Sequence, residues 1–120
     1  MIKNKTGNIL QCTEDIICHQ VNNFGYMSGG LARQLANQYP RLEEKYSEFC
    51  SRWKNDYEEL KGTTYFINVN KKKIIANIFS QKLNFDTDYQ IMRKCFEEIK
   101  YKARCYKKRI AIPYRNTDAE

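Results

Sequence analysis

Short runs of apolar residues along the chain have the length and composition of β-strands. The run at 15–21 is apolar at most positions, which is typical of a strand covered on both faces. The runs at 63–69 and 74–79 are rich in β-branched and aromatic residues, and the polar residues between them predict an antiparallel hairpin. We expect further short strands at 2–5 and 110–114.

Three segments between these runs have apolar residues at helical spacing. The first begins after a glycine pair, Pro40 marks its end or the restart of the next, and Asp86, Thr87 or Asp88 can cap the third. The apolar positions of the three helices are Leu31, Ala32, Leu35, Ala36 and Tyr39; Leu42, Tyr46, Phe49, Cys50 and Trp53; and Tyr89, Met92, Cys95, Phe96, Ile99 and Ala103. Helices that alternate with strands predict an α/β layered domain with a mixed sheet.

The length of 120 residues corresponds to one domain, so we expect residues 1–120 to fold as a unit. No apolar run approaches the length of a bilayer span, and residues 1–5 lack the apolar stretch of a signal peptide. The five cysteines form no CxxC pair and have no zinc-finger spacing, which favours reduced thiols, no metal site and a cytoplasmic location.

The net charge of +7 lies in the second half of the chain. Residues 1–60 carry 7 Lys and Arg against 8 Asp and Glu, whereas residues 61–120 carry 14 against 6. Such an excess favours an anionic partner, a class that includes nucleic acids and nucleotides. It is also common among small basic domains without such a partner.

A dense group of polar and glycine residues separates the strand at 15–21 from the next helix. Gln20 and Asn22 lie at the carboxyl end of the strand, where ligands bind in open α/β sheets. Gly29 and Gly30 come just before the helix, where backbone amides and the helix dipole favour a phosphate. Glycines at such a junction also serve ordinary turns. The only histidine, His19, is more typical of a packed, hydrogen-bonded residue than of a ligand or base.

In this context the chain resembles the macrodomain family, which binds ADP-ribose. The resemblance covers nearly the whole chain in order and is most marked to the bacterial and phage "Appr-1-p processing" type and its terminal-ADP-ribose glycohydrolase relatives. It implies a three-layer fold in which a mixed sheet lies between helices, and ADP-ribose or an ADP-ribosylated macromolecule as partner, with no further cofactor. The segments that carry it are Gly7-Asn8-Ile9-Leu10, Ile17-Cys18-His19-Gln20-Val21-Asn22, Met27-Ser28-Gly29-Gly30-Leu31-Ala32, Tyr39-Pro40, Ile75-Ala76-Asn77-Ile78-Phe79-Ser80-Gln81, Thr87-Asp88-Tyr89 and Ile110-Ala111-Ile112-Pro113-Tyr114.

The resemblance also implies roles for individual residues. Asn8 and Ile9 match the Gly-Asp-Ile motif whose acid recognises the adenine amine, with asparagine in place of the acid. Asn22 matches the residue that faces the distal ribose. The family's Met-Gly-x-Gly loop along the diphosphate carries a serine at its second position here. The expected ligand-binding residues are Asn8, Ile9, Gln20, Asn22, Met27, Ser28, Gly29, Gly30 and Leu31.

Two family features have no counterpart in this sequence. The second glycine-rich loop, the last helix and the last strand would follow Tyr114, but residues 115–120 contain no glycine. The glycohydrolases use a lysine about where Ser80 and Gln81 stand, and an aspartate in that second loop. We therefore expect a truncated domain that binds ADP-ribose without this catalytic pair, and homodimerisation through an open sheet edge.

Two alternative functions stay open at this point. One is enzymatic, either ADP-ribosyl glycohydrolase or ADP-ribose 1″-phosphate phosphatase activity, with His19 as a conceivable base. The other is nucleic-acid binding by the basic segment at 93–109, which also contains Tyr101 and Tyr106. The cations of that segment fall mostly opposite the apolar stripe of its helix, as they do on an ordinary solvated face.

Overall fold

A four-stranded mixed sheet forms the centre of the fold. The computed structural model describes residues 7–22, 27, 29–53, 57–80 and 88–113, without the side chains of residues 57 and 58. The strands are β1 (Ile16–Gln20), β2 (Thr64–Asn68), β3 (Ile74–Ile78) and β4 (Ile110–Ala111), in the spatial order β2-β3-β1-β4. Strand β1 pairs in parallel with both β3 and β4, whereas β2 and β3 form the predicted antiparallel hairpin.

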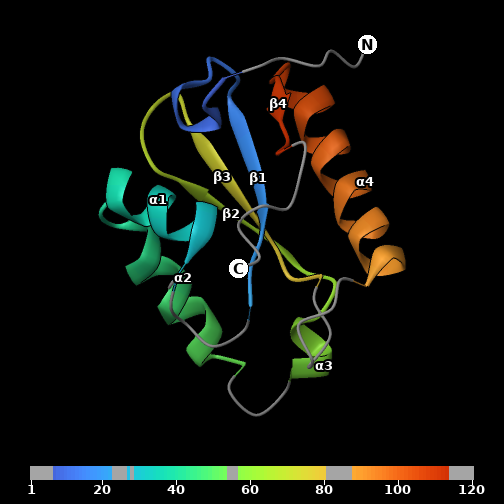
Figure 1. The fold of residues 1–120 in the computed structure, drawn as a ribbon. Helices are drawn as coiled ribbons and strands as arrows, with labels where there is room; N and C mark the ends of the chain where they lie inside the picture. Colours follow the sequence, from blue (N-terminus) through green and yellow to red (C-terminus); the bar gives the residue numbers. More distant parts are fainter. Residues whose placement is uncertain (1–6, 23–26, 28, 54–56, 81–87, 114–120) are drawn as a thin grey trace.

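Helices cover both faces of this sheet. Helices α1 (Gly30–Gln38) and α2 (Leu42–Ser51) lie against one face, and α4 (Tyr89–Tyr106) lies against the other (Figure 1). A 3-10 turn, η1 (Ile9–Gln11), and the short helix α3 (Tyr57–Leu60) complete the described elements. The predicted three-layer α/β arrangement is confirmed. None of the described helices is long and apolar enough to cross a membrane.

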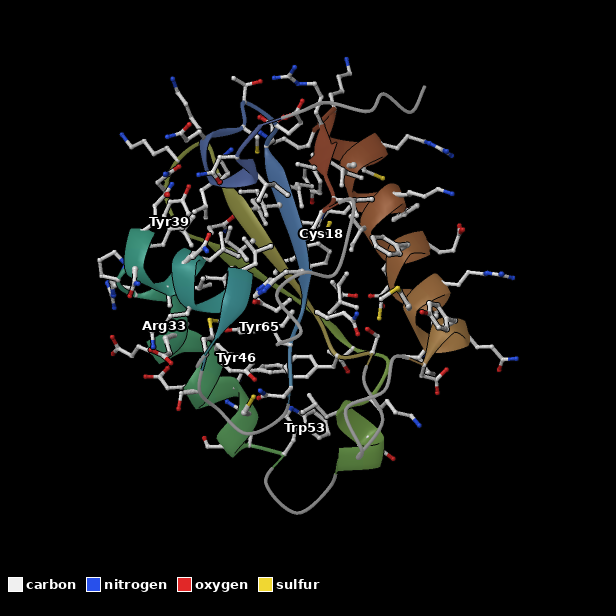
Figure 2. All side chains as sticks on the ribbon, viewed as in Figure 1. Cys18, Arg33, Tyr39, Tyr46, Trp53 and Tyr65 are labelled. Carbon is white, nitrogen blue, oxygen red and sulfur yellow. The ribbon has the colours of Figure 1, made fainter. Side chains whose placement is uncertain are left out.

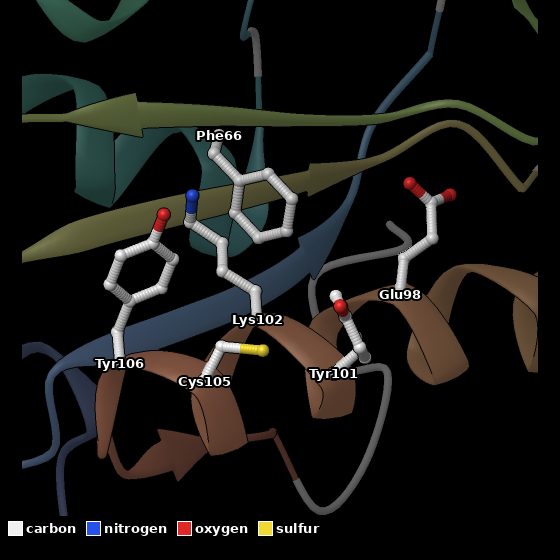
Figure 3. A pocket seen from close by; sticks show the side chains of 6 residues that line it. All are labelled: Phe66, Glu98, Tyr101, Lys102, Cys105 and Tyr106. Atoms are coloured by element: carbon white, nitrogen blue, oxygen red, sulfur yellow. The ribbon is translucent and has the colours of Figure 1, made fainter.

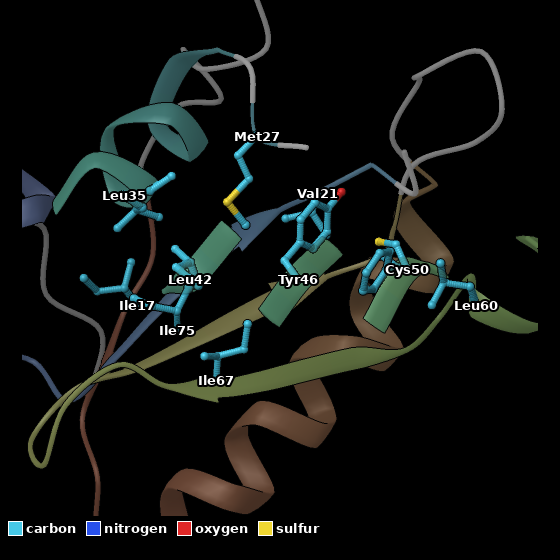
Figure 4. Packing of buried hydrophobic residues seen from close by; sticks show 12 residues of the cluster. Ile17, Val21, Met27, Leu35, Leu42, Tyr46, Cys50, Leu60, Ile67 and Ile75 are labelled. Carbon is cyan, nitrogen blue, oxygen red and sulfur yellow. The ribbon is translucent and has the colours of Figure 1, made fainter. Parts of the chain in front are cut away.

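The two faces of the sheet have separate apolar cores because strand side chains alternate in direction. On the α1/α2 face, Ile17, Ile67 and Ile75 pack against Leu35, Leu42 and Tyr46 (Figure 4). On the α4 face, residues of β1 and β3 pack against Cys95, Ile99 and Ala103. Burial of β1 on both faces explains why its sequence is a nearly continuous apolar run.

Some details differ from the sequence-based prediction. Tyr89 was expected on the buried stripe of α4 but is 77% exposed, because it is the first residue of the helix. The strand expected at 110–114 forms ladder pairs only at Ile110 and Ala111. Neither η1 nor α3 was predicted, because three or four residues carry too little periodicity. The strand expected at 2–5, the candidate caps Asp86 and Thr87, and Tyr114 lie outside the described residues.

Both ends of α4 are capped. The Asp88 side chain accepts a hydrogen bond from the Ile91 N–H at 3.2 Å, as expected for a helix N-cap. At the other end, Lys107 adopts the left-handed conformation with φ 56°, and its N–H bonds to the carbonyl oxygens of Ala103 and Arg104. A residue with a Cβ is strained in this conformation, which glycine adopts freely.

We expect Lys107→Gly to stabilise the protein by about 0.5–1 kcal/mol because it relieves this left-handed strain. Chemical denaturation would measure the free energy of unfolding. The matched control is Lys100→Gly inside the same helix, which should destabilise the protein by about 1 kcal/mol. A loss of stability in both variants would contradict the capping argument.

Candidate functional site

The carboxyl ends of the parallel strands meet at one edge of the sheet, which we call the strand-end edge. It comprises the residues that end or follow β1 and β3: Gln20, Val21, Asn22, Phe79 and Ser80. The buried Ser80 hydroxyl donates to the Gln20 Oε1 at 3.1 Å, so the two strand ends are tied by their side chains. Backbone bonding continues past the strands, since the Val21 N–H donates to the Ile78 carbonyl at 3.0 Å.

The glycine pair forms the start of α1. Gly29 is the N-cap, with an extended backbone (φ −153°) that other residues also adopt. Gly30 has φ 55°, in the left-handed region that favours glycine. Neither glycine is buried, so the first amides of α1, at the positive end of its dipole, lie close to solvent. Ser28, which replaces the family glycine, lies outside the described residues.

Helix α2 positions both chain segments that flank this junction. The Tyr46 hydroxyl contacts the Asn22 backbone carbonyl and lies 2.7 Å from the Asn22 Oδ1. One turn earlier on the same helix, the Glu43 Oε2 accepts a hydrogen bond from the Met27 N–H at 2.6 Å. Asn22 precedes the loop and Met27 lies within it, so one helix fixes the loop at two points.

An arginine of α1 completes this arrangement. The Arg33 guanidinium donates to the Glu43 Oε1 at 3.0 Å and to its Oε2 at 3.4 Å (Figure 2 labels Arg33 and Tyr46). The Glu43 carboxylate therefore joins α1, α2 and the backbone at Met27. Because both partners are partly exposed, the ion pair itself contributes little, and the charge-assisted bond to the Met27 amide is the stronger restraint.

The predicted adenine-recognition residues lie near the other end of α1. Asn8 is exposed, and its Oδ1 accepts a hydrogen bond from the Leu10 N–H at 3.0 Å, which caps η1. The Leu10 carbonyl accepts from the Gln38 Nε2 at 3.0 Å, and Gln38 is the last residue of α1. The nine-residue helix spans about 12 Å. Only an elongated ligand could reach from Asn8 to the glycine pair.

The remaining expected site residues flank α1. Ile9 is half-buried against the α1/α2 core, and Leu31 is half-buried in the first turn of α1. Met27 is 2% exposed and packs in the same core (Figure 4), and its N–H is bonded to Glu43, so its side chain does not face a ligand. Gln20, Asn22, Met27, Gly29, Gly30 and Leu31 thus belong to the chain between the end of β1 and the first turn of α1, whereas Asn8 and Ile9 belong to the segment that bonds to the last residue of α1.

His19 belongs to a buried polar row that crosses the sheet. It is 3% exposed, and its Nε2 lies 2.7 Å from the Asn77 Oδ1 of its registered partner on β3. The Asn77 Nδ2 donates to the Tyr65 carbonyl on β2 at 2.9 Å, so the Asn77 Oδ1 is the acceptor and the His19 Nε2 carries the proton. The buried Nδ1 has no hydrogen-bond partner among the described residues. The packed, hydrogen-bonded role expected for His19 is confirmed.

Burial changes the acid–base properties of groups in both cores. Desolvation lowers the pKa of His19 from 6.5 to about 4, although the Asn77 hydrogen bond acts in the opposite direction. Desolvation also raises the pKa of Cys18 to about 12. No disulfide joins the five cysteines, all of which lie within the described residues.

Sequence reasoning did not identify the residues that hold the loop. Tyr46 was assigned to the apolar stripe of its helix, where its ring does pack, but the pattern gives no sign of its hydroxyl contact. Glu43 was not considered. An acid next to a buried Leu42, three positions before a buried Tyr46, is a signal that could have indicated an inward-facing carboxylate. Ser80, near the expected place of the family lysine, is buried and bonded to Gln20, whereas Gln81 and Lys82 lie outside the described residues.

We expect Glu43→Ala to destabilise the protein by about 1–3 kcal/mol, because it removes the acceptor of the Met27 amide and the partner of Arg33. Glu43→Gln keeps an acceptor and should lose less. Hydrogen exchange at the Met27 amide, together with chemical denaturation, would measure the effect. The exposed neighbour Glu44 supplies the control, and equal losses in Glu43→Ala and Glu44→Ala would rule out the restraint.

The low pKa of His19 predicts a loss of stability in mild acid. Above pH 6.5 the imidazole is neutral in both the folded and the unfolded state, and it contributes no pH dependence. Between pH 6.5 and about 4 the unfolded chain takes up a proton that the folded protein does not, so the free energy of unfolding falls by roughly 3 kcal/mol in total. Urea denaturation at several pH values would show this slope in the wild type. A His19→Gln variant with an equally steep slope would contradict the assignment to His19.

Comparison with known proteins identifies the fold. No protein-family model matches the chain. Among solved structures, the macrodomain of Mycobacterium tuberculosis DarG superposes with a TM-score of 0.81 at 19% identity, over 99% of this chain and 79% of that one. The macrodomain of Thermus aquaticus DarG has a TM-score of 0.73 at 20% identity, over 89% and 72% of the two chains. A macrodomain protein from Streptomyces coelicolor has a TM-score of 0.72 at 19% identity, over 85% and 68%.

The sequence itself is similar to a curated protein. An ADP-ribose 1″-phosphate phosphatase of Lodderomyces elongisporus is 32% identical over 73 residues. The match covers 58% of this chain and 43% of the relative, so the chain spans less than half of the relative's length. The structural neighbours are macrodomains, and the predicted resemblance is confirmed: this chain has the macrodomain fold.

Proposed function

We propose that residues 1–120 form one macrodomain-type domain that binds ADP-ribose at the strand-end edge. The observation that carries this proposal is that α2 holds both Asn22, after the end of β1, and Met27, just before the glycine start of α1. Tyr46 and Glu43 hold the chain on the two sides of this junction. The macrodomain fold of the neighbours and the name of the curated relative support the same ligand.

Each part of ADP-ribose has a chemically suitable partner in this arrangement. The diphosphate lies at the start of α1, where the amides and the helix dipole favour negative charge and glycines leave room for a close approach. The Asn22 side-chain amide, oriented by Tyr46, bonds the hydroxyls of the distal ribose. The adenine lies toward Asn8, whose side-chain oxygen already caps η1 and has a second lone pair for the adenine amine.

A second candidate function is hydrolysis of ADP-ribose 1″-phosphate. The curated relative, named for that activity, favours it. The described residues of the edge contribute mainly amides and hydroxyls, and the only histidine of the chain is buried and bonded to Asn77. Binding is therefore the function that these groups support best. Catalysis requires groups in addition to those we have placed at the edge.

We extend the proposal to location and assembly. The thiol state of all five cysteines supports a reducing compartment, and we place the protein in the cytoplasm.

Strands β2 and β4 are the two edges of the described sheet. An edge strand presents unpaired backbone groups, and this supports pairing with a second copy of the chain as the route to a homodimer.

We expect isothermal titration calorimetry to detect ADP-ribose binding by the wild type. Asn22→Ala should weaken binding by about 10-fold or more, the equivalent of one lost hydrogen bond of about 1.4 kcal/mol. Gly29→Val should weaken ADP-ribose binding further, since a branched side chain would cover the first amides of α1. Valine adopts the extended backbone of Gly29 (φ −153°) without strain, so the fold should be kept.

The control for these variants is Asn70→Ala at the exposed tip of the β2–β3 hairpin, which should bind like the wild type. Thermal melts would establish that each variant is folded. Absence of binding at millimolar ADP-ribose would overturn the proposed function and leave the fold assignment intact.

A further inference from the structure

A shallow groove lies between α4 and the sheet, on the face opposite to α1 and α2. Its volume is about 400 Å³, and it lies on the side of α4 that is directed toward β2 (Figure 3). One lining residue, Phe66, comes from β2, and the other five come from the second half of α4. The lining residues are Phe66, Glu98, Tyr101, Lys102, Cys105 and Tyr106.

Aromatic side chains form much of this groove and are open to solvent. Tyr101 is 71% exposed and Tyr106 is 65% exposed, whereas the core side of α4 is made by Cys95, Ile99 and Ala103. The two tyrosines are therefore not needed to fill the core. Phe66 is half-buried and presents its ring at the floor, beside the lysine that crosses the groove (Figure 3).

A cation lies between the rings. The Lys102 ammonium is 4.7 Å from the Phe66 ring centroid and 5.2 Å from the Tyr106 ring centroid, within the range of cation–π attraction. Its surroundings are strongly basic, because residues 89–109 contain eight Lys or Arg and only two acids, Glu97 and Glu98. Glu97 pairs with Lys100 at 3.3 Å, and Glu98 is the one acid that lines the groove.

We propose that this groove binds single-stranded nucleic acid. Exposed aromatic faces stack on unpaired bases, and the cations of α4 neutralise the phosphates that run beside them. Protein-binding surfaces are instead depleted in lysine. A duplex would keep its base faces hidden from the tyrosines. This site is independent of the strand-end edge and of the ADP-ribose proposal.

The charges of the groove predict whether each charge removal raises or lowers the affinity, whereas an apolar docking site predicts no such change. Lys102, between the rings, attracts a polyanion into the groove, and Glu98, one helical turn away, repels one. Removal of each charge should thus change the affinity in opposite directions. An apolar partner held by the rings would be insensitive to both changes.

Fluorescence anisotropy with labelled single-stranded DNA and RNA oligonucleotides of 12 nucleotides tests the site. In the full chain at low salt, we expect Tyr101→Ala with Tyr106→Ala to weaken binding about 10-fold or more, and Lys102→Ala to weaken it several-fold. Glu98→Gln should tighten it. The matched controls are Tyr89→Ala, which removes an exposed tyrosine outside the groove, and Lys71→Ala, which removes an exposed lysine of the β2–β3 hairpin tip, outside α4.

Three results would overturn the proposal. The first is no binding of the oligonucleotides by the wild type, and the second is an equal loss of affinity in the groove variants and their controls. The third is that inorganic polyphosphate displaces the oligonucleotide equally well from the wild type and from the tyrosine variants. A loss confined to the groove variants, with unchanged melting temperatures and a steep dependence on salt, supports it. Comparison of the two oligonucleotides then assigns the site to DNA, RNA or both.

Discussion

The pairing of β1 on both sides is the constraint on which the rest of the structure depends. Because β3 and β4 run parallel to β1, their carboxyl ends open at one edge of the sheet, and the chain that leaves β1 must turn there into α1. The parallel arrangement also buries β1 on both faces, so helices are required on each side. The junction used for the proposed ligand is therefore a consequence of how the sheet is connected.

Helix α2 joins the stability of the fold to the geometry of that junction. Its residues Leu42, Tyr46 and Cys50 fill the core, and the side chains of Glu43 and Tyr46 hold the chain at Met27 and Asn22. A loop held at only one end would lose more conformational entropy when a ligand orders it. A helix that the sequence identifies as part of the core can thus also position the loop of the proposed site.

The sequence predicted the layers well because they follow from periodicity. The apolar runs identified the strands, the spacing of Leu42, Tyr46 and Cys50 identified the inner side of α2, and the polar residues at 70–73 identified the hairpin. The η1 turn and α3 were missed because they are too short to show a period. The contacts of Glu43, Arg33 and Ser80 could not be predicted, since they join residues brought together only by tertiary structure. The family resemblance supplied the roles expected of Asn8 and Asn22, which periodicity alone could not give.

The two faces of the sheet differ in the chemistry that they offer. On the α1/α2 side, the polar groups at the strand-end edge are few and fixed by the protein's own hydrogen bonds, an arrangement suited to a small ligand of defined shape. On the α4 side, the exposed rings and the excess of cations form a long surface that suits a flexible polyanion. The sheet separates the two surfaces, and β1 contributes to the cores behind both. Because β1 is hydrogen-bonded to a strand on each side, it resists displacement by a ligand bound at either surface. We therefore expect the two sites to act independently, with a coupling free energy near zero.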